Sequence, residues 1–207
     1  MADIEANKVR DLREKTGAGV MDCKKALAES SGDLEKAILW LREKGVASAQ
    51  QRAGRVAKEG SIGSYIHAGG KLGVLVELNC ESDFVAKNDE FQKLLREVAM
   101  QVAAANPRCV RREELSASVV EQERHIYEQQ AEGKPANVVA KIVEGKLEKF
   151  YKEVCLLEQS YVRDPNLTIN DLLGELTAKM KEKIEIRRFA RFQLGETLDG
   201  AGSNNSN

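Results

Sequence analysis

The hydrophobic pattern of this chain changes period at residues 79–91, and this change constrains the fold more than any other feature. Before it, apolar residues occupy alternate positions, as in a strand with one buried face: Leu72, Val74, Val76 and Leu78. After it, apolar residues recur at intervals of three and four, as in a helix with one apolar stripe: Phe91, Leu94, Leu95, Val98, Ala99, Val102 and Ala103. Asn88 is a suitable N-cap for this helix. The sequence therefore predicts a strand followed closely by an amphipathic helix.

The connection between this strand and helix contains Ser82, Asp83, Phe84 and Val85. A Phe is unusual there, because tight connections favour polar and turn-forming residues. Two interpretations are open. Phe84 folds back onto the core beside Phe91, as the general burial of Phe suggests, or it is presented as an exposed wedge for a partner.

The first 45 residues predict three short helices with a very small core. The first helix ends at a turn that contains Gly17 and Gly19, where the backbone needs conformational freedom. The third is capped by Asp33 and is expected to end at Gly45. The pattern looks like a ubiquitin-associated-type bundle. Val20 and Met21 are adjacent at the start of the second helix and cannot both point inward, so one of them is expected to be exposed.

The rest of the chain predicts a small sheet and more helices. Residues 61–67 and 72–79 read as a hairpin around Ala68-Gly69-Gly70-Lys71. A polar helix is expected to begin with a capping box at residues 118–121, and a helix with an apolar stripe from Val138 to Val154 is expected to pair with it. An extended stretch at 155–162 and a turn at 164–166 follow. The last elements are a helix capped by residues 168–171 and a strand at 184–194.

These elements together predict an α+β fold. A three-helix bundle (1–45) is joined by a partly helical linker (46–60) to a core of antiparallel sheet covered by helices (61–195). The tail (196–207) is small and polar and is expected to be disordered.

Composition excludes several classes of function. The apolar content of 42% is sufficient for a hydrophobic core. Charged residues make up 31% but the net charge is only -1, which argues against a dedicated nucleic-acid binder. No apolar run approaches the roughly 20 residues of a membrane span, and the first residues lack the features of a signal peptide. We therefore expect a cytoplasmic protein without nucleic-acid or membrane partners.

No catalytic or metal-binding constellation emerges from the sequence. The four cysteines, Cys23, Cys80, Cys109 and Cys155, have no Cys-x-x-Cys spacing, so no zinc site is expected and buried thiols are the default interpretation. An enzyme with a Cys nucleophile would need His67 or His125 beside it, and no nucleophile motif surrounds either. No phosphate-binding Gly-rich loop is present. We therefore expect no cofactor, metal or catalytic residue.

Two motifs carry a resemblance to a known family. Cys80-Glu81-Ser82-Asp83-Phe84-Val85-Ala86-Lys87-Asn88 resembles the Thr-Asp-Phe-Val-Ala signature of the bacterial translation elongation factor Ts family. The segment from Thr16 to Leu27 is similar to its second signature. Ser82 stands where the family usually has Thr, and Val20 where it usually has Met, so the chemical type is kept. The resemblance covers nearly the whole chain apart from its C-terminal end.

The resemblance implies a guanine-nucleotide exchange factor that binds elongation factor Tu, both GDP-bound and nucleotide-free, without covalent chemistry. It implies that the segment Ser82, Asp83, Phe84 and Val85 displaces the partner's magnesium, with Phe84 as the wedge and Asp83 fixing the loop by hydrogen bonding. It also implies that the N-terminal module docks on the partner through Gly17, Gly19, Val20 and Met21. The alternatives are a ubiquitin-type binding adaptor without exchange activity and an enzyme that uses a Cys.

A homodimer is also expected. Long members of the family carry two related copies of the sheet-containing body and this chain holds one, which leaves an open sheet edge or face that a second copy can cover. The expected seam is the strand 184–194, with Ile184, Ile186, Ala190, Phe192 and Leu194 on one face and Phe189 between Arg187 and Arg191 on the other. Some short members have a Cys near Ala190, so here the pairing should be non-covalent. The alternative is a monomer whose helices cover the sheet fully.

Overall fold

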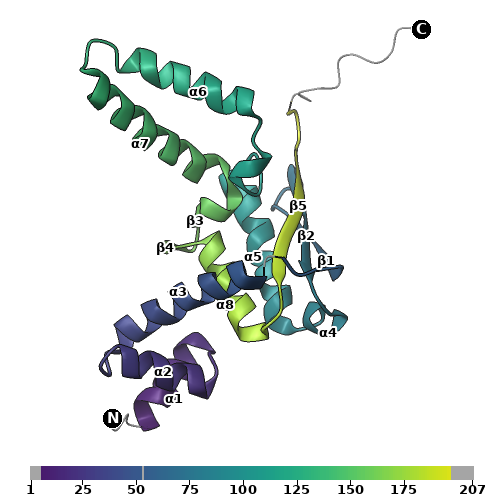
Figure 1. Cartoon of the computed structure of the whole chain (residues 1–207). Helices are drawn as coiled ribbons and strands as arrows, with labels where there is room; N and C mark the ends of the chain where they lie inside the picture. The colour runs from purple at the N-terminus through teal and green to yellow at the C-terminus, as the bar shows by residue number, and fades with distance from the viewer. Residues whose placement is uncertain (1–5, 53, 197–207) are drawn as a thin grey trace.

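The computed structural model describes residues 6–52 and 54–196 and shows an α+β fold (Figure 1). N-terminal helices precede a small antiparallel sheet with helices packed against it, so the predicted fold class is confirmed. The expected disordered tail lies, from residue 197 onward, outside the described residues. No helix in the described ranges is long and apolar enough to cross a membrane.

Three helices form the N-terminal bundle: α1 (Ala6–Thr16), α2 (Val20–Glu29) and α3 (Leu34–Arg52). Their shared core is small and apolar, and its buried members are Val9, Leu12, Cys23, Ala26, Leu27 and Ala37. The prediction that the third helix ends at Gly45 was wrong, because α3 continues to Arg52. The first part of the predicted linker is therefore helical.

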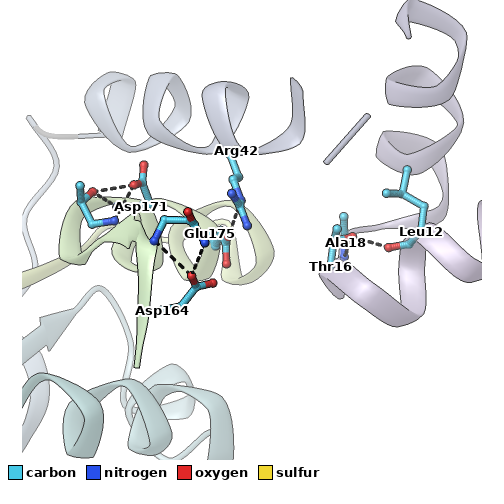
Figure 2. A network of polar contacts seen from close by, with 9 residues as sticks. Leu12, Thr16, Ala18, Arg42, Asp164, Asp171 and Glu175 are labelled. Carbon is cyan, nitrogen blue, oxygen red and sulfur yellow. Dashed lines mark hydrogen bonds and ion pairs between the residues drawn. The ribbon is translucent and has the colours of Figure 1, made fainter. Parts of the chain in front are cut away.

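Gly45 is a packing residue instead of a helix stop. A Cβ atom on Gly45 would lie 3.1 Å from the carbonyl oxygen of Gly174 in α8 (Ile169–Met180), so the two backbones approach closely where α3 crosses α8. Arg42 of α3 donates a hydrogen bond from Nε to Oε1 of Glu175, with an N–O distance of 3.2 Å (Figure 2). The bundle is thus in direct contact with the body of the molecule.

The sheet has the strand order β1-β2-β5, with both pairings antiparallel. The predicted hairpin is confirmed as β1 (Glu59–Ile66) and β2 (Leu72–Cys80). Helix α5 (Asp89–Ala105) covers one face of the sheet, and the largest buried side chains there include Leu78, Phe91, Leu95 and Ile186. The predicted Asn88 cap is confirmed, since Asn88 Oδ1 accepts the Glu90 N–H at 2.9 Å.

Strand β5 (Ile184–Gln193) contains a bulge that reverses the predicted alternation of side chains. Leu78 of β2 pairs with Ile186, but Val76 pairs with Phe189, so Arg187 is the extra residue. An extra residue shifts every later side chain to the opposite face. Phe189 therefore packs on the core, whereas Phe192 is exposed and does not share a face with Ile186, contrary to the prediction.

A helical hairpin projects from the body (Figure 1). It consists of α6 (Ala117–Gln130) and α7 (Ala136–Val154), and the predicted pairing of these helices is confirmed. The predicted capping box at Ser118 was wrong: α6 begins earlier, and Ser116 is its N-cap, with Ser116 Oγ accepting the Val119 N–H at 3.4 Å.

Shorter elements complete the chain: α4 (Asp83–Ala86), the 3-10 turns η1 (Arg112–Glu114) and η2 (Leu156–Glu158), and the strands β3 (Ser160–Tyr161) and β4 (Asp164–Thr168). The stretch predicted as extended thus contains a 3-10 turn, and the predicted turn at 164–166 is the start of β4. The predicted cap of α8 is confirmed as a capping box: Thr168 Oγ1 accepts the Asp171 N–H, and Asp171 Oδ2 accepts the Thr168 N–H (Figure 2).

Candidate partner-binding surface

The connection between β2 and α5 folds into the single-turn helix α4. Ser82 is its N-cap: the residue is in an extended conformation and its Oγ accepts the Val85 N–H at 3.4 Å. Serine suits this position because its short side chain satisfies an N–H that lacks a partner within the helix. The turn ends at Lys87, immediately before Asn88 caps α5.

The turn divides its side chains between the core and the solvent. Val85 and Ala86 are buried against the sheet and α5, whereas Phe84 is 80% exposed. The interpretation that Phe84 folds onto the core beside Phe91 was therefore wrong for this structure. Burial of a Phe side chain contributes about 1.5–3 kcal/mol, and here most of that contribution is left available to a partner.

The base of α4 is fixed by Glu182, which lies in the connection between α8 and β5. The Ser82 N–H donates to Glu182 Oε2 at 3.0 Å, and the Ser82 hydroxyl donates to Glu182 Oε1 at 2.7 Å. Both carboxylate oxygens therefore hold the residue that starts the turn. Glu182 is a functional candidate that the sequence did not reveal, because nothing in local spacing relates it to Ser82.

Glu81 forms a second attachment one residue earlier. Its Oε1 accepts the Lys183 backbone N–H at 2.5 Å and a bond from Arg55 Nη1 at 3.2 Å. The Lys183 N–H and then Arg55 hold the pKa of Glu81 below its ordinary value, so the carboxylate stays ionised. Lys183 Nζ also donates to the Arg55 carbonyl at 3.0 Å, so Glu81, Arg55 and Lys183 form a small hydrogen-bonded network at the base of α4.

Asp83 does not take part in this network. Its Oδ2 accepts a hydrogen bond from Lys87 Nζ at 2.7 Å within the same turn, and this bond lowers the pKa of Asp83. Both side chains are largely exposed, so the ion pair adds little to stability. The expectation that Asp83 fixes the loop is corrected in the free chain: Ser82 and Glu81 hold it.

The N-terminal signature forms a second exposed apolar surface. Gly17 has a φ of 66°, which favours glycine, and Gly19 is the N-cap of α2. Val20 is 42% and Met21 is 74% exposed, so both side chains, and not only one, face solvent. In Figure 1, α2 and α4 lie at the lower end of the molecule, with α8 between them.

The histidines and cysteines were the residues considered for covalent or metal chemistry. Among the described residues, the two histidines bond to partners other than a thiol: His67 Nδ1 lies 2.9 Å from the Tyr65 hydroxyl, and His125 Nε2 lies 3.2 Å from Gln129 Nε2. All four cysteines are buried free thiols, and burial raises the pKa of Cys80 to about 11. A Cys nucleophile in an enzyme must be ionised near neutral pH and open to its substrate, and these thiols do not have that environment. Within residues 6–52 and 54–196, no group of three or more His, Cys, Asp or Glu is placed to hold a metal ion.

Comparisons with known proteins agree with the motifs. The family model described as Elongation factor TS matches residues 6–196. The curated protein named "Elongation factor Ts" of Desulforamulus reducens is 58% identical over 201 residues, which is 96% of this chain and 93% of the relative. The protein of the same name from Carboxydothermus hydrogenoformans is 60% identical over 197 residues, 94% of this chain and 91% of the relative.

A more distant relative shows the same coverage. The protein named "Elongation factor Ts" from Geobacter sulfurreducens is 55% identical over 198 residues, 95% of this chain and 92% of the relative. The chain, from its first described helix to the end of its last strand, belongs to the elongation factor Ts family of translation elongation factors.

Proposed function

We propose that this translation elongation factor is a guanine-nucleotide exchange factor that binds elongation factor Tu–GDP and promotes release of GDP in the cytoplasm. The observation that carries the proposal is the exposure of Phe84 on a turn whose base is held rigidly by Glu81, Ser82 and Glu182. The position of α4 must be fixed, because Phe84 can displace groups of the partner only if its own backbone does not move on contact.

The proposed mechanism is physical. Phe84 enters a groove beside the magnesium site of the partner and displaces the metal, with Ser82 and Asp83 beside it in the contact. Val85, expected to share this contact, is buried and instead packs the turn onto the core. GDP phosphates without their magnesium carry unneutralised charge, so the nucleotide leaves faster. Linkage requires that GDP weakens binding of this chain by the same factor by which this chain weakens binding of GDP.

The wedge alone is too weak for a large effect. Shifting a two-state equilibrium by 10,000-fold takes about 5.5 kcal/mol of differential affinity, whereas burial of one Phe contributes about 1.5–3 kcal/mol. We propose that the N-terminal module, residues 1–45, adds binding energy through the turn of Gly17 and Gly19 and the exposed Val20 and Met21. Residues 46–60 would connect this module to a core of residues 61–195. The same contacts would hold the nucleotide-free partner.

We further propose a non-covalent homodimer through the outer face of the sheet, away from α5. The bulge in β5 places Phe192 on this face, and its other exposed apolar residues are Ile62, Ile66 and Leu75. Phe192 and Ile66 flank Gly73 of the central strand, which leaves a shallow apolar row across the sheet. Contiguous exposed apolar surface commonly marks a protein interface.

The decisive experiment measures release of labelled GDP from elongation factor Tu with this chain and with its variants. We expect Phe84→Ala to slow the accelerated release by about tenfold or more, since 1.4 kcal/mol corresponds to a factor of ten. Its melting temperature should stay near that of the parent, because substitutions at exposed positions usually change stability by less than about 0.5 kcal/mol. Ile126→Ala, an exposed apolar residue on α6, is the matched control.

The outcomes separate the alternatives. Binding to elongation factor Tu without faster release, in the parent chain, would favour the ubiquitin-type adaptor. An unchanged rate for Phe84→Ala would remove Phe84 from the mechanism even if exchange itself is observed.

A further inference from the structure

Two cysteines that are far apart in sequence meet at the base of the helical hairpin. Cys109 lies between α5 and η1, and Cys155 is the C-cap of α7. Their backbones form an isolated parallel bridge. It is held by Arg108 N–H to the Val154 carbonyl at 2.8 Å and by Leu156 N–H to the Cys109 carbonyl at 3.0 Å.

The two thiols are already in contact. The Sγ atoms of Cys109 and Cys155 lie 3.7 Å apart. A disulfide needs Cα atoms about 4.4–6.8 Å apart, and bridged backbones with a spacing of about 4.8 Å meet this condition. Rotation of the side chains can therefore close the bond without separating the backbones.

The surroundings of the pair favour sulfur chemistry over metal binding. Phe150 and Val154 bury the thiols, with Leu115 and Tyr151 packed against the same cluster. A structural zinc site takes four ligands, and no third His, Cys, Asp or Glu joins the pair to form such a group in the part of the chain that the structure describes.

The two thiols differ in reactivity. Burial, and then the hydrogen bond with Cys109, raise the pKa of Cys155 to about 12. Burial also raises the pKa of Cys109, but there the hydrogen bond with Cys155 opposes the rise, so Cys109 ionises more readily than its neighbour. Cys109 is also 7% exposed, whereas Cys155 is fully buried. Cys109 is thus the thiol that an oxidant reaches first, and Cys155 is placed to resolve the product.

We propose that Cys109 and Cys155 form a modification site, an oxidisable dithiol that closes an intramolecular disulfide when the protein meets a hydroperoxide. With hydrogen peroxide, the Cys109 thiolate takes one oxygen, the O–O bond breaks, and the released hydroxide leaves as water after taking a proton. The Cys155 sulfur then attacks the sulfenic sulfur, the S–S bond forms, and the second oxygen leaves as water. Two thiols lose two electrons, and one peroxide becomes two waters.

The bond would fix the base of the hairpin, because residues 109 and 155 bracket all of α6 and α7. In the part of the chain that the structure describes, the thiols of the other two cysteines bond to backbone carbonyls and not to a second thiol. Cys23 Sγ lies 3.6 Å from the Ala18 carbonyl, and Cys80 Sγ lies 3.1 Å from the Ser82 carbonyl. These two thiols are internal controls within the same chain.

The test treats the full chain with increasing hydrogen peroxide, then counts thiols after denaturation and maps the linked peptides. We expect two of the four thiols to disappear together, with a mass loss of two hydrogen atoms and a Cys109–Cys155 peptide that a reductant separates. Cys109→Ser and Cys155→Ser should each form no intramolecular disulfide, whereas Cys23→Ala should still form it. The oxidised parent should melt at a higher temperature than the reduced parent, since the bond restrains the unfolded chain.

Other patterns of oxidation would contradict the proposed disulfide. The proposal is overturned if Cys109 and Cys155 stay reduced until Cys23 and Cys80 have reacted, or if the bridges join other pairs or separate chains. Equilibration in mixtures of oxidised and reduced glutathione removes any dependence on rate. A pair that is no more easily oxidised there than Cys23 and Cys80 contradicts the site as well.

Discussion

At the scale of single residues, two carboxylates at the base of α4 accept the hydrogen bonds that fix the candidate surface. Glu182 receives two bonds from Ser82, and Glu81 receives one from the backbone of Lys183. The motif around Phe84 indicates which side chain is presented, but not what holds it. Ser82 and Glu182 meet only through the tertiary fold, so no local pattern could have predicted the pair.

Glu182→Gln should weaken exchange while the chain stays folded. The amide offers one acceptor and one donor group, so one of the two bonds to Ser82 is lost, and a hydrogen bond to a charged group contributes about 1.5–3 kcal/mol. We expect slower GDP release and a modest fall in melting temperature. Glu148→Gln is the control, since Glu148 on α7 also accepts two hydrogen bonds, from Arg112 at the base of the projecting hairpin. Equal effects of the two variants would contradict a positioning role for Glu182.

Glu81 predicts the direction of a pH effect on stability. Its pKa is lowered by folding, so its contribution is fully present above the unfolded pKa of about 4.3 and is lost as the pH falls through the lower folded value. Chemical unfolding of Glu81→Gln and of the parent, followed from pH 7 to acid, should therefore converge as the pH falls. A difference in stability that grows towards acid would contradict the assignment.

At the scale of elements, the sequence predicted the features that depend only on residues close together in the chain. The Asn88 cap, the capping box of Thr168 and Asp171, and the hairpin around Gly69 and Gly70 were each encoded within a few residues. The bulge at Arg187 was not, because alternation shows the period of a strand and not a residue that leaves the ladder. Gly45 looked like a helix end because its reason, a close approach to Gly174, lies on another helix.

The crossing of α3 and α8 can be tested with two glycines. A Cβ on Gly45 meets the backbone oxygen of Gly174 at 3.1 Å, whereas a Cβ on Gly145 in α7 meets nothing within 4 Å. Gly45→Val should separate the helices and lower the melting temperature. Gly145→Ala should raise stability by up to about 1 kcal/mol through helix propensity. If Gly45→Val melts no lower than the parent, the close crossing is not a determinant of stability.

At the scale of the whole molecule, the sheet has one covered face and one open face. Helix α5 lies on the inner face, while the outer face carries exposed apolar side chains beside the ion pair of Arg188 and Glu77, whose N–O distance is 2.6 Å. The sequence analysis proposed β5 as the seam of a dimer and placed its apolar residues on one face, whereas the bulge divides these residues between the two faces of the sheet. As a result, Phe189 packs on the core and Phe192 lies on the outer face.

The homodimer should therefore depend on concentration and be insensitive to reductant. Two copies can bring their outer faces together about a twofold axis, and all four thiols are buried away from such a contact. Light scattering over a dilution series, with and without reductant, should show the mass of a dimer giving way to that of a single chain on dilution alone.

Phe192→Glu should be a single chain at concentrations where the parent is a dimer, because association would bury an unpaired carboxylate. Ile126→Glu, on the projecting hairpin, should remain a dimer. A single-chain mass for the parent at every concentration would refute the pairing, and loss of the dimer only on reduction would refute its non-covalent nature.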